Sequence, residues 1–492
     1  MLPLMSAPNM SLIAEIQKLE AVARRLEPGA ADRRSAREKV VAYTEDFLER
    51  LGEIPTFVGK HDGGIGLLSE QIGEEPADLG KLLALVRDNV DRPGLNPASG
   101  GHLGYIPGGG LYHASLGDYM ADITNRFAGV NFASPGAVRM ENMLIDWMRE
   151  VVGYPAGTVG NLTSGGSIAN LIGIVAARDE SGIRAADYAR SVIYLTDQAH
   201  HSVQKAVRIA GLGETVLRYI PTDERHRMSA DLLEKAIIGD LENALLPMAI
   251  IASAGTTDTG AVDPLDAIAE IAARRAIWYH IDGAYGAFFA LCDEGKSVLG
   301  GMEKSDSLVM DPHKGLFLPY GTGAVLVKNA GRLLESFHYQ ANYMQDAVRD
   351  EGSPSPADLS PELTKHFRGL RLWLPLKLHG LAPFRAGLRE KILLARYFHG
   401  RLQEMEGFET GPVPDLSVVT YRYVPRRGDP DEFNERLAAE VRRDGRVFLS
   451  STMLRGRFTL RLAVLSFRTH LDTIDLTIDI LKEKAKMIES SQ

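Results

Sequence analysis

The chain has 492 residues, of which 45% are hydrophobic and 24% are charged, and its formal net charge is −9. This composition is typical of a globular protein with a sizeable core, and the acidic balance gives no reason to expect a nucleic-acid partner. The single cysteine, Cys292, excludes an intrachain disulfide, and no apolar run approaches the roughly 20 residues that span a bilayer. We therefore expect a cytoplasmic protein with no membrane partner.

The N-terminal part is expected to be helical. Residues 12–51 are charged and periodic, which predicts one or two amphipathic helices. Residues 1–100 contain too few strand-like runs for a core of their own, so we expect this segment to lie across a neighbour.

The middle of the chain alternates between strand-like and helix-like stretches. Strands are predicted at 191–197, 214–221, 248–255, 277–282, 307–311 and 323–329. Helices are predicted at 163–180, 200–211, 229–244 with Ser229 as N-cap, and 263–276 with Asp263 as N-cap. Because the strands are apolar throughout, they indicate a sheet buried on both faces. We therefore predict an α/β fold with mostly parallel strands.

The C-terminal part predicts a smaller domain. Residues 363–405 have helical spacing, and 416–488 predict strand, helix, strand and helix, as in a small α+β domain. We place the large domain at 101–375 and the small one at 376–492. Residues 347–361 are rich in proline, glycine and serine, which suits a mobile lid.

Polar residues follow several predicted strands, where ligands bind in parallel sheets. They are Asp197 to His201, Thr256, Asp282 and the pair His313–Lys314.

The helix at 163–180 opens with Gly165, Gly166 and Ser167. A glycine-opened helix start presents free N–H groups and a positive dipole end, which suit a phosphate. An ordinary capped helix is the alternative.

Asp282 and the histidines 200 and 201 allow two interpretations each. A carboxylate that ends an apolar strand can keep an aromatic ring nitrogen protonated, or it can be a turn residue. Adjacent histidines point apart, and no third ligand is evident, so no metal is expected. One histidine ring can instead stack on an aromatic cofactor, or cap a helix.

Lys314 lies between His313 and a run of apolar and glycine residues. Burial lowers the pKa of a lysine, and the neutral amine can then form a Schiff base with a carbonyl. A surface-loop lysine is the alternative. Together, a phosphate site, an aspartate, a stacking imidazole and a buried lysine are the parts that hold pyridoxal 5′-phosphate, PLP.

Beyond these parts, the chain resembles the group II PLP-dependent amino acid decarboxylases, which include aromatic-L-amino-acid, tryptophan, histidine and glutamate decarboxylases. The resemblance runs from about residue 35 to the end. The motifs that carry it are HLGYIPGG (102–109), NFASPGAVRMENMLIDWM (131–148), SGGSIAN, DQAHHSV, AGTTDTGAVDPL (254–265), HIDGAYG, DPHKG and RFTLRLAV (457–464).

This resemblance implies the fold of aspartate aminotransferase (fold type I) and a homodimer with the active site at its interface. The N-terminal helices would wrap the partner subunit. The implied roles are the Schiff-base lysine for Lys314, the ring-nitrogen partner for Asp282 and the stacking ring for His200. Ala284 would lie against the cofactor ring and Thr256 near it. The phosphate would lie at Gly166, Ser167 and His313.

Family decarboxylases carry a tyrosine on a mobile loop that protonates the carbanion after CO2 leaves. That loop should lie just before residue 365, but 349–364 contain no tyrosine. The nearest upstream tyrosines are Tyr339 and Tyr343. Either Tyr343 serves, or another donor acts, or the carbanion meets oxygen and yields an aldehyde.

The substrate is expected to be an aromatic amino acid. The resemblance places Tyr105, Ile106 and Pro107 at the substrate side chain, and Gly108 to Gly110 leave room for a bulky group. The alternatives are an aldehyde synthase, a glutamate or aspartate decarboxylase, and a non-catalytic member. The last is disfavoured because Lys314, Asp282 and His200 are all present.

Overall fold

The computed structural model describes residues 7–59, 63–338 and 354–491. The chain forms two compact units, Met1–Asn96 and Pro97–Gln492. Within the described residues, none of the helices is long and apolar enough to cross a lipid bilayer.

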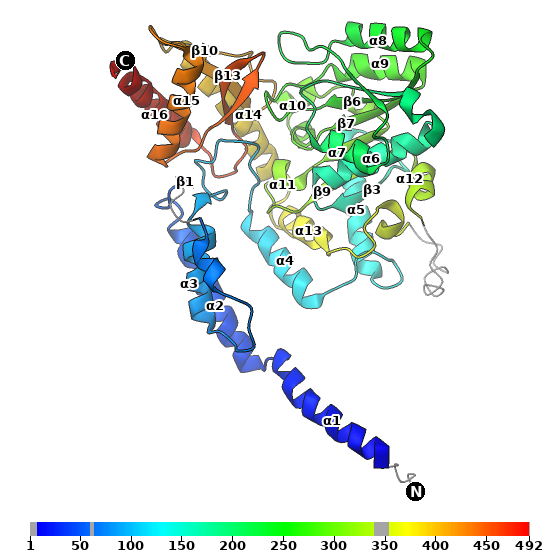
Figure 1. Ribbon diagram of the computed structural model, residues 1–492, viewed down its shortest axis with the longest axis vertical. Coiled ribbons are helices and arrows are strands. Elements are labelled where there is room, and N and C mark those ends of the chain that lie inside the picture. The colour runs from blue at the N-terminus through cyan, green and yellow to red at the C-terminus, as the bar shows by residue number, and fades with distance from the viewer. Residues whose placement is uncertain (1–6, 60–62, 339–353, 492) are drawn as a thin grey trace. The chain divides into compact units, whose positions relative to one another are not determined.

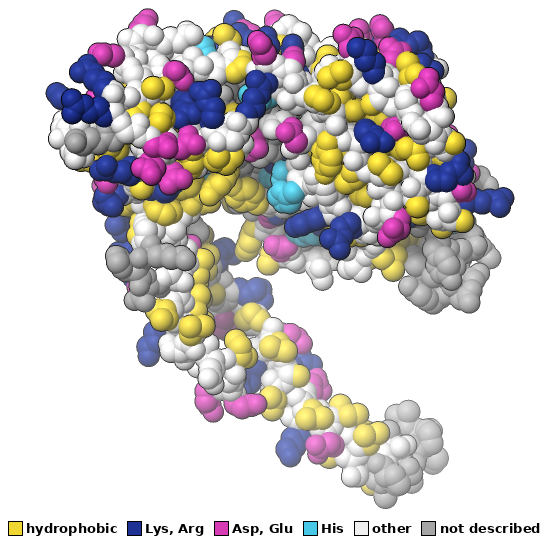
Figure 2. Space-filling model, turned by 45° about the horizontal axis from the view of Figure 1, so that its top comes forward, with side chains coloured by type: hydrophobic (Ala, Val, Ile, Leu, Met, Phe, Trp, Pro, Cys, Tyr) yellow, Lys and Arg dark blue, Asp and Glu magenta, His cyan; other side chains and the backbone are white. Residues whose placement is uncertain are grey.

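The first unit consists mainly of helices. Its elements are α1 (Ala7–Ala23), α2 (Ala30–Glu49), α3 (Leu79–Val86) and a two-stranded antiparallel sheet of β1 (Phe57–Val58) and β2 (Gly94–Leu95). The prediction of one or two helices at 12–51 is confirmed, although the first helix begins earlier, at Ala7. Neither α2 nor α3 buries a residue, and apolar side chains lie at the surface of these helices in Figure 2. The described part of this unit therefore lacks a substantial core.

The second unit is built on a seven-stranded sheet (Figure 1). Its strands are β3 (Val159–Thr163), β4 (Ser191–Leu195), β5 (Val216–Tyr219), β6 (Leu246–Ser253), β7 (Trp278–Asp282), β8 (Ser307–Met310) and β9 (Gly323–Val327), in the order β3-β9-β8-β7-β6-β4-β5. β9 pairs antiparallel with both of its neighbours, β3 and β8, and the other four strand pairs are parallel. The predicted α/β fold with mostly parallel strands is confirmed.

Helices pack around this sheet. They are α4 (Tyr112–Thr124), α5 (Pro135–Val152), α6 (Gly166–Glu180), α7 (Ser202–Ile209), α8 (Ala230–Glu242), α9 (Leu265–Arg275), α10 (Asp293–Val298), α11 (Pro312–Gly315), α12 (Ala330–Phe337) and α13 (Arg368–His379). Ser229 caps α8 as predicted, because its side chain accepts a hydrogen bond from the N–H of Leu232. Every residue of β4 and β9 is buried, as expected for strands covered on both faces.

The prediction that Asp263 caps α9 is wrong. Its buried carboxylate instead accepts hydrogen bonds from the N–H groups of Met228 and Ser253, each at 2.7 Å. The side chain thus ties the end of β6 to the start of α8 instead of satisfying its own helix. Burial raises the pKa of Asp263 to about 6.

A second, four-stranded antiparallel sheet lies toward the C-terminus. Its strands β10 (Phe408–Thr410), β11 (Val418–Tyr423), β12 (Ser450–Leu454) and β13 (Arg457–Ala463) pair in the order β10-β11-β13-β12. It packs with α14 (Ala382–Gln403), α15 (Pro430–Asp444) and α16 (Leu471–Ser490) around a separate apolar cluster. The strands β10 and β12 were not predicted. The helical stretch at 363–405 is divided into α13 and α14 at Gly380, whose φ is +65°.

The edge strand β3 is covered on its outer side by a buried ion pair. Glu141 of α5 accepts hydrogen bonds from the N–H of Leu162, at 2.9 Å, and from Lys365 Nζ, at 2.7 Å. The Lys365 ammonium also donates to Asn161 Oδ1 at 2.6 Å. These contacts satisfy the free edge of a strand that leads directly into the loop at 164–167.

Candidate active site

A cavity of about 320 Å³ lies at the carboxyl ends of the sheet strands, where ligands bind in this class of fold. It is lined by Ser164, Gly165, Gly166, Ser167, Asn170, His200, Ser202, Ser253, Gly255, Thr256, Thr257, Asp282, Ala284, Tyr285, Asp311, His313 and Lys314. Eight predicted cofactor-site residues are in this set: Gly166, Ser167, His200, Thr256, Asp282, Ala284, His313 and Lys314.

The first turn of α6 forms one wall. The N–H groups of Gly166 and Ser167 have no protein acceptor among the described residues, as expected for a helix start. A Cβ at position 166 would lie 3.0 Å from Asp311 Oδ2 and 3.2 Å from Ala284 Cβ. A side chain at this position would press on both neighbours, so glycine keeps this wall open. The free N–H groups and the dipole of a 15-residue helix suit a phosphate.

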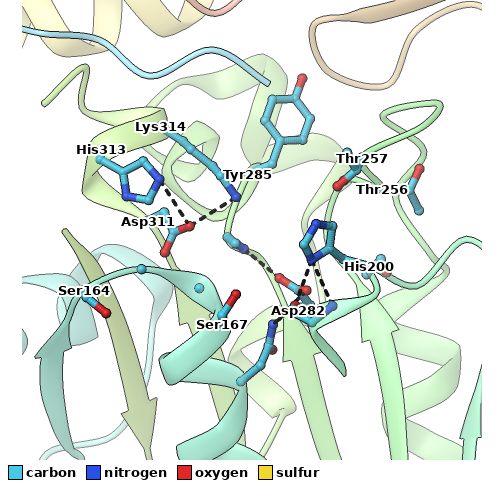
Figure 3. A pocket seen from close by; sticks show the side chains of 17 residues that line it. Ser164, Ser167, His200, Thr256, Thr257, Asp282, Tyr285, Asp311, His313 and Lys314 are labelled. Atoms are coloured by element: carbon cyan, nitrogen blue, oxygen red, sulfur yellow. Dashed lines mark hydrogen bonds and ion pairs between the residues drawn. The ribbon is translucent and has the colours of Figure 1, made fainter. Parts of the chain in front are cut away.

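Lys314 and His313 approach from α11, on the opposite side of the cavity from Asp282 and His200 in Figure 3. The Lys314 ammonium lies 3.1 Å from Asp311 Oδ2, and the other oxygen of this buried carboxylate has no hydrogen-bond partner among the described residues. His313 donates from Nδ1 to the carbonyl oxygen of Thr322 at 2.6 Å. Burial lowers the pKa of His313, although the nearby Asp311 opposes this effect.

Asp282 ends β7 with its carboxylate oriented into the cavity. Its Oδ1 accepts from the N–H of Ala284 at 3.1 Å, and its Oδ2 accepts from Asn170 Nδ2 at 3.0 Å. A carboxylate oxygen can accept more than one hydrogen bond, so each retains capacity for a donor in the cavity.

His200 lies at the start of α7. Its Nδ1 is 2.8 Å from Ser202 Oγ and accepts from the N–H of Ser202 at 3.3 Å. Burial lowers the pKa of His200. The ring is therefore held in the neutral form, with its proton on Nε2.

Thr256 and Tyr285 complete the wall, but their hydroxyl groups have protein partners. Thr256 Oγ1 is 2.8 Å from Thr259 Oγ1, and Tyr285 Oη is 2.7 Å from Ser417 Oγ. The role predicted for Thr256 beside the cofactor ring stays a prediction.

Arg461, which is buried on β13, connects the small sheet to the cavity wall. Its guanidinium donates to the carbonyl oxygens of Thr257, Asp258 (2.6 Å) and Tyr105 (3.3 Å), and to Ser450 Oγ (2.8 Å). These acceptors are all uncharged, and burial lowers the pKa of this arginine.

The three predicted substrate residues are not among those that line the cavity of the single chain. The Tyr105 side chain is 57% exposed and packs against Phe448, with ring centroids 5.5 Å apart. Ile106 and Pro107 likewise do not line this cavity, and Tyr343 lies outside the described residues. These four assignments stay predictions.

Sequence reasoning missed Asn170, Ser202 and Asp311. Asn170 stands in the quoted motif SGGSIAN and Asp311 in DPHKG, so both were adjacent to predicted site residues. Their contacts with Asp282 and Lys314 became evident only from the structure.

A fold-type-I sheet with a lysine, an aspartate, a neutral imidazole and a glycine-opened helix around one cavity defines a PLP-dependent enzyme. The comparisons agree with this class. The family model "Pyridoxal-dependent decarboxylase conserved domain" matches residues 66–424, so the chain belongs to this family, and PLP is its cofactor.

Three similar proteins illustrate the relationship. Aromatic-L-amino-acid decarboxylase of Bacillus atrophaeus is 33% identical over 407 residues, covering 82% of this chain and 84% of the relative. Phenylacetaldehyde synthase of Petunia hybrida is 28% identical, covering 91% and 93%. The crystal structure of Oryza sativa TDC with PLP and tryptamine superposes with a TM-score of 0.88 at 27% identity, covering 94% of this chain and 99% of that one. The chain is thus a PLP-dependent amino acid decarboxylase.

Proposed function

We propose that the chain decarboxylates an aromatic L-amino acid to the corresponding amine. The observation that carries this proposal is the charge of the cavity wall. Among the described residues that line it, the only lysine or arginine is Lys314. The described wall thus offers no guanidinium for the bidentate contact that favours a second, side-chain carboxylate, as in glutamate or aspartate.

We assign the following tasks to this chain's residues. When bound, PLP supplies a conjugated ring that accepts the electron pair left as CO2 departs. Asp282 keeps a proton on the ring nitrogen, since a nearby anion favours the protonated form. The N-terminus of α6 binds the phosphate, and Lys314 presents the amine that anchors the cofactor.

His200 and Asp311 prepare the same cavity. The neutral His200 offers a flat ring surface and an N–H at Nε2 to the cofactor and substrate side of the cavity. Asp311 holds the Lys314 ammonium in place at 3.1 Å. Residues 349–364 lack the tyrosine that family members carry there, and we propose the upstream Tyr343 as the residue that returns the proton to the product.

The proposal is tested by an amine-release screen of the purified chain with added PLP. Tryptophan, tyrosine and phenylalanine are compared with glutamate and aspartate, and Lys314→Ala serves as the inactive control. Amine from an aromatic substrate is expected. Release from the acidic substrates alone would refute the aromatic assignment.

An aldehyde-forming reaction is the second candidate, because residues 349–364 contain no tyrosine and one relative is a phenylacetaldehyde synthase. This reaction consumes one O2 and one water for each amino acid and releases the aldehyde, CO2, ammonia and hydrogen peroxide. Peroxide and ammonia in amounts equal to CO2 would identify it, and an amine without peroxide would exclude it.

We also propose that the enzyme is a homodimer. One face of α4 carries exposed apolar residues at helical spacing: Tyr112, Leu116, Tyr119, Met120 and Ile123. Such a stripe on a surface helix is typical of an interface. In the first unit, Leu12, Ile16 and Leu19 of α1 are exposed in the same way, which supports the proposal that this segment wraps the partner. The lone cysteine supports a cytoplasmic location.

A further inference from the structure

A line of polar side chains runs through the buried interior beneath the cavity, between β8, β7 and α6. Trp278 Nε1 donates to Ser307 Oγ at 2.9 Å, and Ser307 Oγ lies 2.7 Å from His280 Nδ1. His280 Nε2 lies 2.9 Å from Asn170 Oδ1. Ser307, His280 and Asn170 are each at most 1% exposed. Solvent therefore supplies no alternative partners, and the four groups must satisfy one another.

Trp278, the first residue of this hydrogen-bonded series, fixes which group donates and which accepts in each bond. An indole N–H is a donor only, so Ser307 Oγ accepts from Trp278 and its own hydrogen is free to point to His280 Nδ1. His280 then carries its proton on Nε2 and donates it to Asn170 Oδ1. Burial holds the pKa of His280 well below its ordinary value, which agrees with a neutral ring.

At Asn170 this series of hydrogen bonds divides into two branches, and both branches end at the cavity. Its amide nitrogen has two hydrogens, and it lies 3.0 Å from Asp282 Oδ2 and 3.1 Å from Ser202 Oγ. Because Ser202 Oγ accepts from this amide, its hydrogen is directed to His200 Nδ1, 2.8 Å away. One amide therefore orients the carboxylate of Asp282 and the hydroxyl of Ser202, which together with the Ser202 N–H keeps His200 Nδ1 an acceptor.

Asp282, at the other end of the hydrogen-bonded series, requires the same order of donors and acceptors. A carboxylate only accepts hydrogen bonds, so Asp282 must face the NH2 of Asn170 and not its oxygen. Gly173 of α6 leaves space for the His280 imidazole between the helix and the sheet, because a Cβ at this position would lie 2.5 Å from His280 Cε1.

We propose that Asn170 is a positioning residue for the cofactor, and that it is held in its working orientation by His280, Ser307 and Trp278. This inference rests on the proposed function, since Asp282 and His200 are the groups assigned to the cofactor. It implies that a change in the Asn170 side chain alters the positions of Asp282 and His200 together.

The test compares Asn170→Leu with Asn434→Leu. Asn434 is a suitable control because it is also fully buried, and its side chain bonds Tyr423 and Pro430 far along the chain in the small domain. Both variants bury an apolar side chain of similar shape in a polar site, so both are expected to lower the unfolding midpoint. Only Asn170→Leu is expected to raise the Kd of PLP, by about tenfold or more, and to alter the visible circular dichroism of the bound cofactor.

A second pair of variants tests the same inference if Asn170→Leu fails to fold. His280→Gln keeps an N–H donor toward Asn170 and is expected to retain PLP affinity and spectrum, whereas His280→Phe removes the donor and is expected to lose affinity. Equal PLP affinity and spectra in wild type, Asn170→Leu and His280→Phe would overturn the inference, as would equal losses in Asn434→Leu. If the wild-type chain itself fails to bind PLP, the proposed function fails instead.

Discussion

The buried pair Glu141–Lys365 yields a quantitative prediction about the strand that leads to the phosphate wall. The Lys365 side chain is fully buried, and burial lowers its pKa in spite of the carboxylate 2.7 Å away. Loss of hydration opposes the attraction between two buried charges and can offset it. The pair itself contributes little net stability, but either charge left alone is strongly unfavourable.

Glu141→Gln is expected to lower the free energy of unfolding by about 3–5 kcal/mol, because it leaves a buried ammonium with neutral acceptors only. Lys365→Met strands the carboxylate and is expected to cost a similar amount. The double variant Glu141→Gln/Lys365→Met leaves no buried charge and is expected to be more stable than either single variant.

Urea denaturation at a fixed PLP concentration measures all four proteins, since bound cofactor shifts the apparent stability equally only when its concentration is held constant. A loss below about 1 kcal/mol in both single variants would refute the reasoning. So would a double variant whose loss equals the sum of the single losses, because two uncoupled sites add.

Three further predictions concern the cofactor wall, the dimer and pH. Gly166→Ala is expected to weaken PLP binding about tenfold or more, measured by titration of the visible absorbance, because its methyl group would lie against Asp311 and Ala284. Tyr119→Glu/Ile123→Glu is expected to convert a dimer to monomer in light scattering, with unchanged far-ultraviolet circular dichroism. The pKa of Asp263, raised by burial to about 6 from an unfolded value of about 3.9, means that the folded state binds more protons between these values. Its contribution to stability is therefore largest below about pH 4 and is lost as the pH rises through 6. Asp263→Asn is expected to reduce the difference between the free energies of unfolding measured at pH 5 and pH 7.

The sheet was largely predictable because six of its seven strands coincide with strand-like runs in the sequence. The strand β3 was missed because its sequence, VGNLT, has only two strongly apolar residues. It is buried because Glu141 and Lys365 cover its edge, and because Gly160 lets it approach β9, where a Cβ would lie 2.3 Å from the carbonyl oxygen of Val325. These are contacts between distant segments, which local patterns do not contain.

The residues of the cavity likewise include some that the sequence predicts and some that it does not. Lys314 and Asp282 each follow a predicted strand, so their shared edge of the sheet was predictable from topology. The glycine-opened helix was predicted from its own sequence, although the strand before it was missed. Asn170 was not predictable, because its role depends on Asp282, 112 positions away, and on a histidine that the sequence shows only as part of a strand. Hydrogen-bond direction is a property of the assembled interior.

The guanidinium of Arg461 has a consequence for how substrate preference evolves. It belongs to the small sheet, yet it fastens the backbone of Thr257 in the cavity wall and of Tyr105 nearby. A new preference can therefore arise in two ways, by replacing residues that face the ligand or by tilting the β-hairpin that carries this arginine. Directed evolution of such an enzyme would be expected to return beneficial changes in β12 and β13, remote from the chemistry.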